Sequence, residues 1–303
     1  MKHLLVYNPD YLRILQEFEK ALFTKGYATS YMHVSNAREF VFFLESKGIS
    51  DIRTVKAIDI ISYYEYLKER PNQRREGGLS NSYLKHQLFA LRLLFDYLTD
   101  TKQVEGSPAR LPKFSIGKSQ EREILTVEEI IQVFECCKDK RERAILSLAY
   151  GCGLRRSEIK ELNLMDVQLS KGMLVVRDGK NHRSRTIPVS NSVAKELREY
   201  VLYERTNYLK EDIVTHAFIV SDTGQRMTGQ YLNDNVRAVM KRTDIKKHIT
   251  LHCLRHSIAT HMLDKGADIE FVKNFLGHIS IDTSHIYSKR RKQRLNLKNQ
   301  ILA

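Results

Sequence analysis

Apolar residues recur at helical spacing through the first third of the chain. Four runs between residues 10 and 104 carry apolar side chains three or four positions apart, which is the repeat of one face of an amphipathic helix. The fourth run opens at Ser80-Asn81-Ser82, residue types that cap the start of a helix. We therefore predict an all-α domain over residues 1–106, with these apolar stripes: Leu12, Leu15, Phe18 and Leu22; Phe40, Phe43 and Leu44; Ile58, Ile61, Tyr64 and Leu67; and Leu84, Leu88, Leu91, Phe95 and Leu98.

The helical pattern breaks at residues 107–122, where Pro108, Pro112 and Gly117 fall close together. Proline stiffens a connecting segment and glycine loosens it, so we predict a linker here. Thr126 and Glu129 then have the spacing of a capping box, which predicts the start of a new helix.

The second domain, residues 123–303, mixes helical and strand-like patterns. Two β-rich runs, 173–176 and 185–189, flank a turn signal at 178–181, which predicts a hairpin. A third short strand is predicted at 217–220. The pattern indicates an α+β, mainly helical domain with a small antiparallel sheet.

Length and charge indicate a class of partner. The 303 residues are enough for two domains of ordinary size, each with its own core. The chain has 50 Lys and Arg against 36 Asp and Glu, a net charge of +14 that is spread along the sequence. This excess favours a polyanion such as DNA or RNA as the partner. An ordinary basic protein would have the same balance, so charge alone does not decide.

Composition also narrows the compartment and the chemistry. No apolar run approaches the ~20 residues that cross a bilayer, and residues 1–10 lack the apolar core of a signal peptide. The four cysteines have no zinc-ligand spacing, and the chain has no P-loop or acidic metal cluster. We predict reduced cysteines, no metal, no cofactor, and a soluble, cytoplasmic protein.

The first candidate for anion binding is Arg155, which follows a glycine break at residues 151–153. Ser157 is placed to open a helix, and the N–H groups of a helix start point toward an anion. Glu158 lies three positions on, on the same helical side, where it can hold the guanidinium. The alternative is an ordinary surface arginine paired with a surface glutamate.

Two predicted loops carry basic side chains that either solubilise a turn or reach a nucleic-acid phosphate. One is the tip of the hairpin, and the other, residues 71–78, joins the third and fourth helical runs. The basic residues are Lys180, His182, Arg183 and Arg185 at the tip and Arg74 and Arg75 in the loop.

The last third of the chain gathers an arginine, several histidines and a tyrosine. His252 and Arg255 are three positions apart and share a helical face, and His256 is one residue off that face. Tyr287 lies nine residues beyond His278. An arginine fork binds phosphodiester oxygens, a histidine moves a proton near neutral pH, and a phenol can form a covalent ester. The set indicates covalent chemistry on a nucleic-acid phosphate.

Five motifs stand in a fixed order along the second domain. They are Gly-Leu-Arg155-x-Ser-Glu158, Gly-Lys180 before a strand ending Arg185-Thr-Ile-Pro188, His252-x-x-Arg255-His, Leu-Gly-His278 and Tyr287. This order resembles the tyrosine recombinases, also called the phage-integrase family. The resemblance covers about residues 120–290, and the helical domain is similar by pattern only. It implies an all-α, SAM-like core-binding domain before a catalytic α+β domain.

The resemblance also implies a role for each residue. Tyr287 would attack the phosphodiester and form a 3′-phosphotyrosyl link, while Arg155 and Arg255 neutralise the non-bridging oxygens. His252 would assist as base, and Lys180 would protonate the departing 5′ oxygen. The implied catalytic residues are Arg155, Lys180, His252, Arg255, His278 and the nucleophile Tyr287, with Glu158 in support.

The implied partner is double-stranded DNA in the bacterial nucleoid. The resemblance implies a homotetramer on paired DNA sites and a monomer or weak dimer when free. Apolar positions after Tyr287 would pack on their own domain or on a neighbouring protomer. Arg156 stands where the family often has an apolar residue. The DNA-binding candidates are Arg74, Arg75, Lys85, Arg156, His182, Arg183, Lys289 and Arg290.

Three functions are weighed. The first is a site-specific DNA recombinase of integrase or invertase type, from a bacterium or a mobile element. The second is a type IB topoisomerase, which has related chemistry but relaxes supercoils without strand exchange. The third is a DNA-binding regulator that has lost catalysis. The filled catalytic positions and the separate helical domain favour the recombinase.

Overall fold

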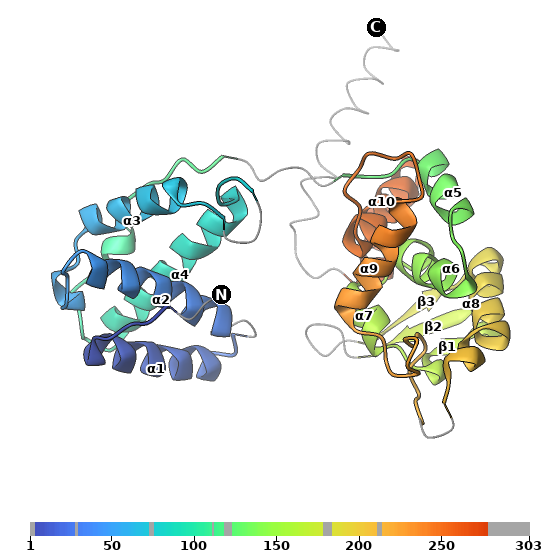
Figure 1. The fold of residues 1–303 in the computed structure, drawn as a ribbon, viewed down its shortest axis with the longest axis horizontal. Helices are drawn as coiled ribbons and strands as arrows, with labels where there is room; N and C mark the ends of the chain where they lie inside the picture. The colour runs from blue at the N-terminus through green and yellow to red at the C-terminus, as the bar shows by residue number, and fades with distance from the viewer. Residues whose placement is uncertain are drawn as a thin grey trace, which may run out of the picture. The chain divides into compact units, whose positions relative to one another are not determined.

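The chain divides into two compact units, Met1–Glu121 and Arg122–Ala303 (Figure 1). The computed structural model describes residues 4–27, 30–72, 76–110, 112–117, 123–177, 184–210 and 214–277. Each unit has its own cluster of buried apolar side chains.

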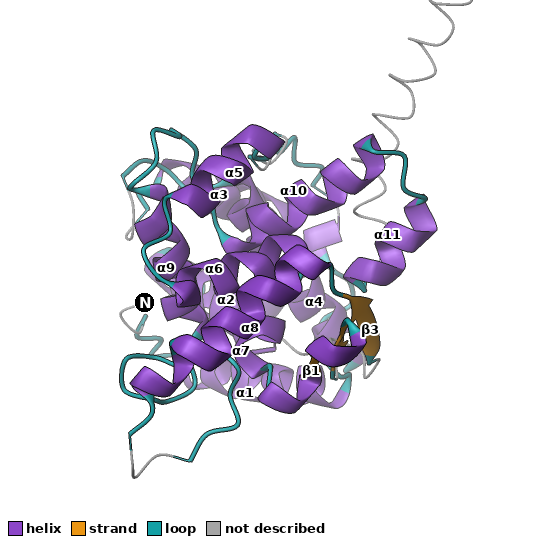
Figure 2. Cartoon of the chain, turned by 90° about the vertical axis from the view of Figure 1, so that its right-hand side faces the viewer, coloured by secondary structure: helices purple, strands orange, loops and turns teal. Residues whose placement is uncertain are grey.

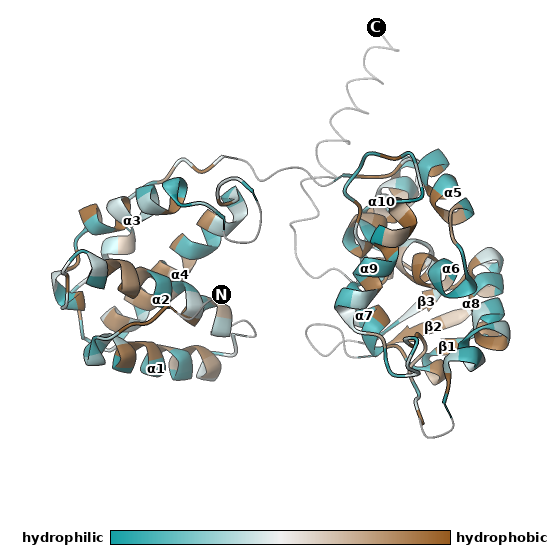
Figure 3. Ribbon diagram, in the orientation of Figure 1, coloured by the Kyte–Doolittle hydropathy of each residue, from teal (hydrophilic) through white to brown (hydrophobic). Residues whose placement is uncertain are grey.

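The described secondary structure of the first unit is helical, apart from one isolated bridge between Pro71 and Gly78. Its second helix packs against both the first and the fourth, and apolar faces turn toward the interior (Figure 3). Ser80 is the N-cap of the fourth helix and accepts a hydrogen bond from Tyr83 N, as predicted. The four α-helices are α1 (Pro9–Thr24), α2 (Ser30–Ser46), α3 (Ala57–Glu69) and α4 (Asn81–Asp100).

The predicted apolar stripe of α3 is partly wrong. Ile58 and Ile61 are 60% and 39% exposed, whereas Ile60 and Tyr63 are fully buried. Both possible stripes of this helix include Tyr64 and Leu67, so sequence spacing alone did not settle which side faces the core.

A buried ion pair fixes the end of α3. Arg70 Nη2 lies 2.6 Å from Glu39 Oε1, and the same carboxylate accepts hydrogen bonds from Tyr83 Oη and Gln87 Nε2. A buried charge is tolerated when it is paired and hydrogen-bonded, as Glu39 is here. The pair therefore anchors the chain where the loop after α3 begins.

The second unit is mainly helical with one small sheet, as predicted (Figure 2). The sheet has the order β1-β2-β3 and is antiparallel, and Leu174 pairs with Ile187. The turn predicted at 178–181 lies outside the described residues. The elements are β1 (Val167–Gln168), β2 (Met173–Val176), β3 (Arg185–Pro188), α5 (Val127–Glu135), α6 (Lys140–Leu146), α7 (Arg156–Glu161), α8 (Asn191–Tyr203), α9 (Gly229–Met240), α10 (Leu251–Asp264) and α11 (Ile269–Leu276).

The strand predicted at 217–220 is wrong. This segment is buried, but it forms only isolated bridges, and the two-residue β1 completes the sheet instead. The Arg205 guanidinium donates to the carbonyl of Ala217 at 2.8 Å and 3.1 Å, and Tyr200 Oη accepts the N–H of Val220. Side chains thus satisfy backbone groups that a strand would pair with a neighbour.

A short π-helical segment links α6 to the glycine break. It spans Ser147–Gly151 and packs against α10 and α8. A Cβ at Gly151 would lie inside contact distance of Val193 Cγ2 on α8. Glycine is therefore required here by close packing of the segment on α8.

The cysteines and the helix lengths can be compared with the sequence. The four cysteines are free thiols, and Cys152 and Cys253 are buried. Within the described residues, no helix is both long enough and apolar enough to cross a membrane.

Candidate active site

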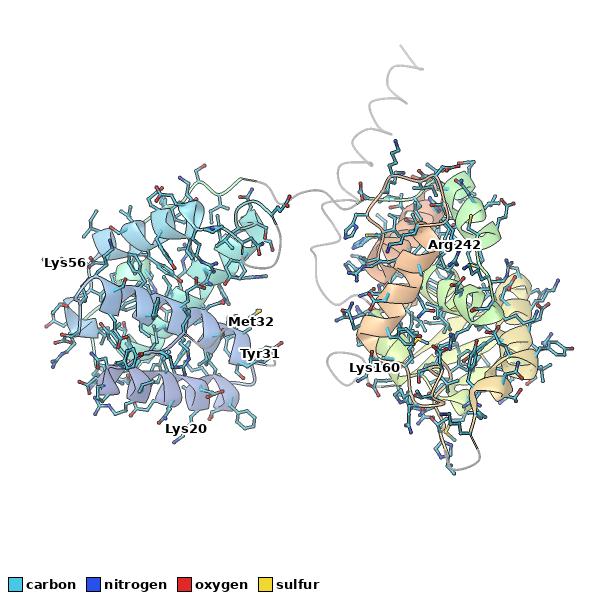
Figure 4. The ribbon with its side chains drawn as sticks, viewed as in Figure 1. Lys20, Tyr31, Met32, Lys56, Lys160 and Arg242 are labelled. Atoms are coloured by element: carbon cyan, nitrogen blue, oxygen red, sulfur yellow. The ribbon has the colours of Figure 1, made fainter. Side chains whose placement is uncertain are left out.

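Arg155 occupies the N-cap position of α7. The helix begins at Arg156, one residue before the predicted Ser157. Glu158 reaches back and accepts the N–H of Arg155 at 2.8 Å, which forms a capping box, and its other oxygen accepts Arg155 Nη1 at 2.7 Å. The predicted contact between Glu158 and the Arg155 guanidinium is confirmed. Lys160, on the outer side of the same helix (Figure 4), pairs with Glu161.

Arg185 is not a tip residue, contrary to the prediction. It opens β3, and its side chain is 12% exposed. Its Nη1 and Nη2 donate to the two oxygens of Glu158 at 2.9 Å and 2.8 Å, and its Nε donates to the carbonyl of Phe275 at 3.1 Å. This fork geometry is the strong, bidentate form of an arginine–carboxylate pair.

Arg255 lies in α10, and its side chain is 2% exposed. Its Nη1 donates to the carbonyl of Gly153 and its Nη2 to the carbonyl of Leu276. The same Nη1 lies 3.6 Å from Glu158 Oε2. One buried carboxylate therefore lies among three guanidinium groups that come from different elements.

The three arginines also meet at the C-terminal end of α11. Arg185, Arg255 and Arg155 donate to the carbonyls of residues 275, 276 and 277 in turn. The last carbonyls of a helix have no partner within it and carry partial negative charge, so cations stabilise this end. Gly277 ends the helix in the left-handed region at φ +63°, a conformation that glycine adopts readily.

The environment of Glu158 keeps it ionised. Burial alone would raise the pKa of this carboxyl, but the hydrogen bonds and charge of Arg185, the N–H of Arg155 and the charge of Arg255 lower it to about 2. The described cluster therefore holds three positive groups around one negative group. This net positive charge lies in a largely buried place, where it interacts strongly with an anion.

His252 and His256 form a contact that the sequence did not predict. They lie one helical turn apart on α10, with their Nε2 atoms 3.1 Å apart and their rings edge to face. His252 is exposed, while His256 is 8% exposed. A hydrogen bond between two imidazole nitrogens requires that one donates and the other accepts.

A model of the phage integrase family matches residues 123–294, which include all of these residues. The chain belongs to the phage integrase family. Tyrosine recombinase XerA of Thermococcus kodakarensis is 34% identical over 218 residues, covering 71% of this chain and 73% of the relative. Tyrosine recombinase XerC of Lacticaseibacillus casei is 29% identical over 263 residues, covering 84% and 86%.

A solved structure supports the fold. The crystal structure of XerH site-specific recombinase bound to a palindromic difH substrate is similar with a TM-score of 0.74 at 23% identity, covering 96% of this chain and 84% of that one. The protein is thus a tyrosine recombinase, an enzyme that breaks and rejoins DNA. The topoisomerase and regulator hypotheses gain no support from these relatives.

Several predicted site residues of the recombinase lie outside the described residues, so the structure says nothing of them. Two described DNA-binding candidates are exposed: Lys85 on α4 and Arg156 on α7. The Arg156 side chain lies close to Gly229 at the start of α9. No group of His, Cys, Asp or Glu that could hold a metal occurs in the described part of the chain. The predicted site residues that lie outside the described part of the chain are Arg74, Arg75, Lys180, His182, Arg183, His278, Tyr287, Lys289 and Arg290.

Two contacts in this cluster were not predicted from the sequence. The spacing of His252 and His256 was available as a signal, since residues four apart on a helix are neighbours. The pairing of Arg185 with Glu158 had no local signal, because 27 positions separate the two residues.

Proposed function

We propose that this recombinase is a site-specific enzyme that cuts and rejoins double-stranded DNA through a 3′-phosphotyrosyl intermediate at Tyr287. The observation that carries the proposal is the cluster of Arg155, Arg255 and Glu158. It joins residues about 100 positions apart and abuts the helix end that directly precedes His278. A phosphodiester would supply the negative charge that balances this cluster.

The arginines act on the pentacoordinate state of the phosphate. Arg155 and Arg255 donate to the non-bridging oxygens, whose charge repels the attacking phenolate. Each guanidinium has five N–H donors, so one arginine can hold a carbonyl and a phosphate oxygen at the same time. Removing a preorganised donor of this kind slows the reaction by about 10²–10³-fold. Glu158 fixes the plane of Arg155 through its bond to Nη1.

Proton transfers complete the scheme. A tyrosine with an ordinary pKa of ~10 is mostly protonated at neutral pH, so His252 accepts its proton during attack. His278 adds a hydrogen bond to the phosphate. Lys180 gives a proton to the departing 5′ oxygen. In the return reaction a 5′ hydroxyl attacks the phosphotyrosyl link, and the roles reverse. We propose no metal and no cofactor.

The first unit acts as the core-binding domain with a SAM-like helical fold, and residues 107–122 act as the linker. The net charge of +14 supports DNA as its partner. Solved relatives are described as bound to DNA substrates, among them XerH and lambda integrase. We propose a homotetramer on paired sites and a monomer or weak dimer without DNA, in the cytoplasm and associated with the nucleoid.

The recombinase, of integrase or invertase type, contacts DNA through basic side chains. These are Arg74, Arg75, Lys85, Arg156, His182, Arg183, Lys289 and Arg290. Phosphate contacts fix the position of the enzyme on DNA, while base contacts choose the site.

The test is the Tyr287→Phe variant on a suicide duplex that carries the recombination site. We expect the variant to bind the site as the wild type does and to form no SDS-resistant adduct, because phenylalanine has no nucleophilic oxygen. Gel electrophoresis of the adduct and a binding titration measure the two properties.

Tyr231→Phe is the matched control, since Tyr231 lies on α9 and hydrogen-bonds Asp222. It should form the adduct at the wild-type rate. Adduct formation by Tyr287→Phe would show that another residue is the nucleophile. Relaxation of supercoils without exchange between two duplexes would show a topoisomerase instead.

A further inference from the structure

We propose that Arg185 is a positioning residue of the active site, which holds Glu158 and the end of α11 so that Arg155 and Arg255 stay in place to bind the phosphate. This inference rests on the proposed function and names a residue to which that mechanism gives no role. It follows from the contacts of Arg185 with Glu158 and with Phe275.

Arg185 supplies half of the hydrogen bonds that Glu158 accepts among the described residues. Each carboxylate oxygen accepts one bond from the Arg185 fork and one from Arg155, by side chain or backbone. A carboxylate oxygen accepts about two hydrogen bonds. With Arg185 in place, both oxygens of Glu158 therefore have their full number of hydrogen bonds, and the carboxylate does not attract further donors.

Without Arg185, the same carboxylate would compete with DNA for the other arginines. The nearest additional donor is Arg255 Nη1, which already lies 3.6 Å from Glu158 Oε2. A buried carboxylate that loses a bidentate partner draws a remaining cation toward itself, because leaving its charge unpaired is costly. Arg255 would then move away from the place where a phosphate oxygen would lie.

The third contact of Arg185 sets the position of α11. Its Nε holds the carbonyl of Phe275, next to the carbonyls that Arg255 and Arg155 hold. Space for this side chain depends on Gly277, where an added Cβ would lie 2.7 Å from Arg185 Nη1. Nε, Nη1 and Nη2 of Arg185 each already donate to Phe275 or Glu158, so Arg185 acts through these groups rather than on DNA directly.

The experiment measures single-turnover adduct formation by Arg185→Gln on two suicide duplexes. One has an ordinary scissile phosphate, and the other has a methylphosphonate there, in either stereoisomer, which removes the charge of a non-bridging oxygen. On the ordinary duplex we expect a loss on the order of 10²-fold, as displacement of catalytic groups by about 1 Å causes. On at least one methylphosphonate isomer we expect the loss of rate, relative to the wild type on the same duplex, to be smaller by about tenfold. The reason is that the methylphosphonate has less negative charge for the arginines to neutralise.

An equal deficit on the phosphate and on both methylphosphonates would overturn the proposal, since general loss of structure slows every substrate alike. A fall of about 1 in the slope of log K against log salt would also overturn it, because Arg185 would then be a direct phosphate contact. Formation of a covalent adduct by the wild type on the ordinary duplex tests the proposed function separately from the role of Arg185.

Two further variants keep the test valid if Arg185→Gln folds poorly. Arg185→Lys retains the charge beside Glu158 but lacks the planar fork, so it should fold and still show the methylphosphonate-sensitive deficit. A wild-type rate for Arg185→Lys would contradict the role. The matched control is Arg177→Gln, which breaks an arginine–carboxylate pair with Asp166 beside the same sheet and leaves Glu158 and α11 untouched. It should cleave both duplexes at the wild-type rate.

Discussion

Glu158 accepts hydrogen bonds from Arg155 and Arg185 and lies close to Arg255. The contact with Arg155 was predictable, because residues three apart on a helix are neighbours. The other two partners come from β3 and α10, and only the tertiary fold brings them there. Local spacing therefore predicted the support of one arginine, while the shared carboxylate could not be foreseen.

The pKa of Glu158 leads to a prediction about stability against pH. Its pKa is lowered from 4.5 to about 2 on folding, so ionised Glu158 stabilises the folded state above about pH 4.5. This contribution corresponds to about 3 kcal/mol and is lost as the pH falls toward 2. Glu158→Gln should be less stable than the wild type at pH 7, and the difference in free energy of unfolding should narrow in acid. Urea unfolding at pH 7 and pH 3 measures it.

Glu161→Gln is the control for this prediction. Glu161 lies on the same helix, and its side chain is 64% exposed beside Lys160. Exposed pairs contribute about 0–1 kcal/mol, so this variant should differ little from the wild type at either pH. A Glu158→Gln deficit that stays constant between the two pH values would contradict the lowered pKa.

Among the elements, those with long periodic patterns were predicted well. Local information was enough to predict the four described helices of the first unit, the hairpin strands, the capping box at Thr126 and the N-cap at Ser80. The failures have tertiary causes. Residues 217–220 form only isolated bridges, to Asn163 and Arg226, and Arg205 donates to the carbonyl of Ala217. Strand β1 has only two residues, too few to show a periodic pattern.

The π-helical segment before Arg155 supplies a prediction at this scale. Gly151→Ala places a methyl against Val193 on α8, and overpacking of this kind costs about 1–3 kcal/mol. Adding Val193→Ala removes the obstructing methyls. Alanine at 151 should then be neutral or slightly stabilising, because it lowers the entropy of the unfolded chain.

Thermal unfolding of the two single variants and the double variant measures this coupling. The double variant should be about as stable as Val193→Ala alone. Additive losses would mean that Gly151 is required by its backbone conformation and not by its contact with Val193.

The described residues form two hydrophobic cores, one in each unit. The change of period near residue 107 indicated an all-helical region followed by a mixed one. Apolar spacing also predicted most residues of the first core, since such patterns reflect the face that each helix buries. It could not predict how the arginines of the second unit meet, because that depends on packing between distant segments.

Two cores predict two unfolding transitions. Phe40→Ala removes a fully buried ring from the first core and should cost about 3–5 kcal/mol in that unit. It should lower the midpoint temperature of one calorimetric transition and leave that of the other unchanged. Leu197→Ala, in the second core, should affect the other transition. Equal shifts of every transition in both variants would show that the chain unfolds as a single cooperative unit.

The contacts between the arginines and the last carbonyls of α11 lead us to expect weak binding of small anions at this site. A cell is full of free phosphate, nucleotides and other small anions that bare guanidinium groups would collect. Here helix carbonyls and one carboxylate already occupy part of the donor set. A small anion therefore meets arginines whose donors are partly occupied, and it should bind weakly. A ligand that also binds the protein at other points along its length should bind better. Among the cell's phosphates, a long duplex meets that condition and a free metabolite does not.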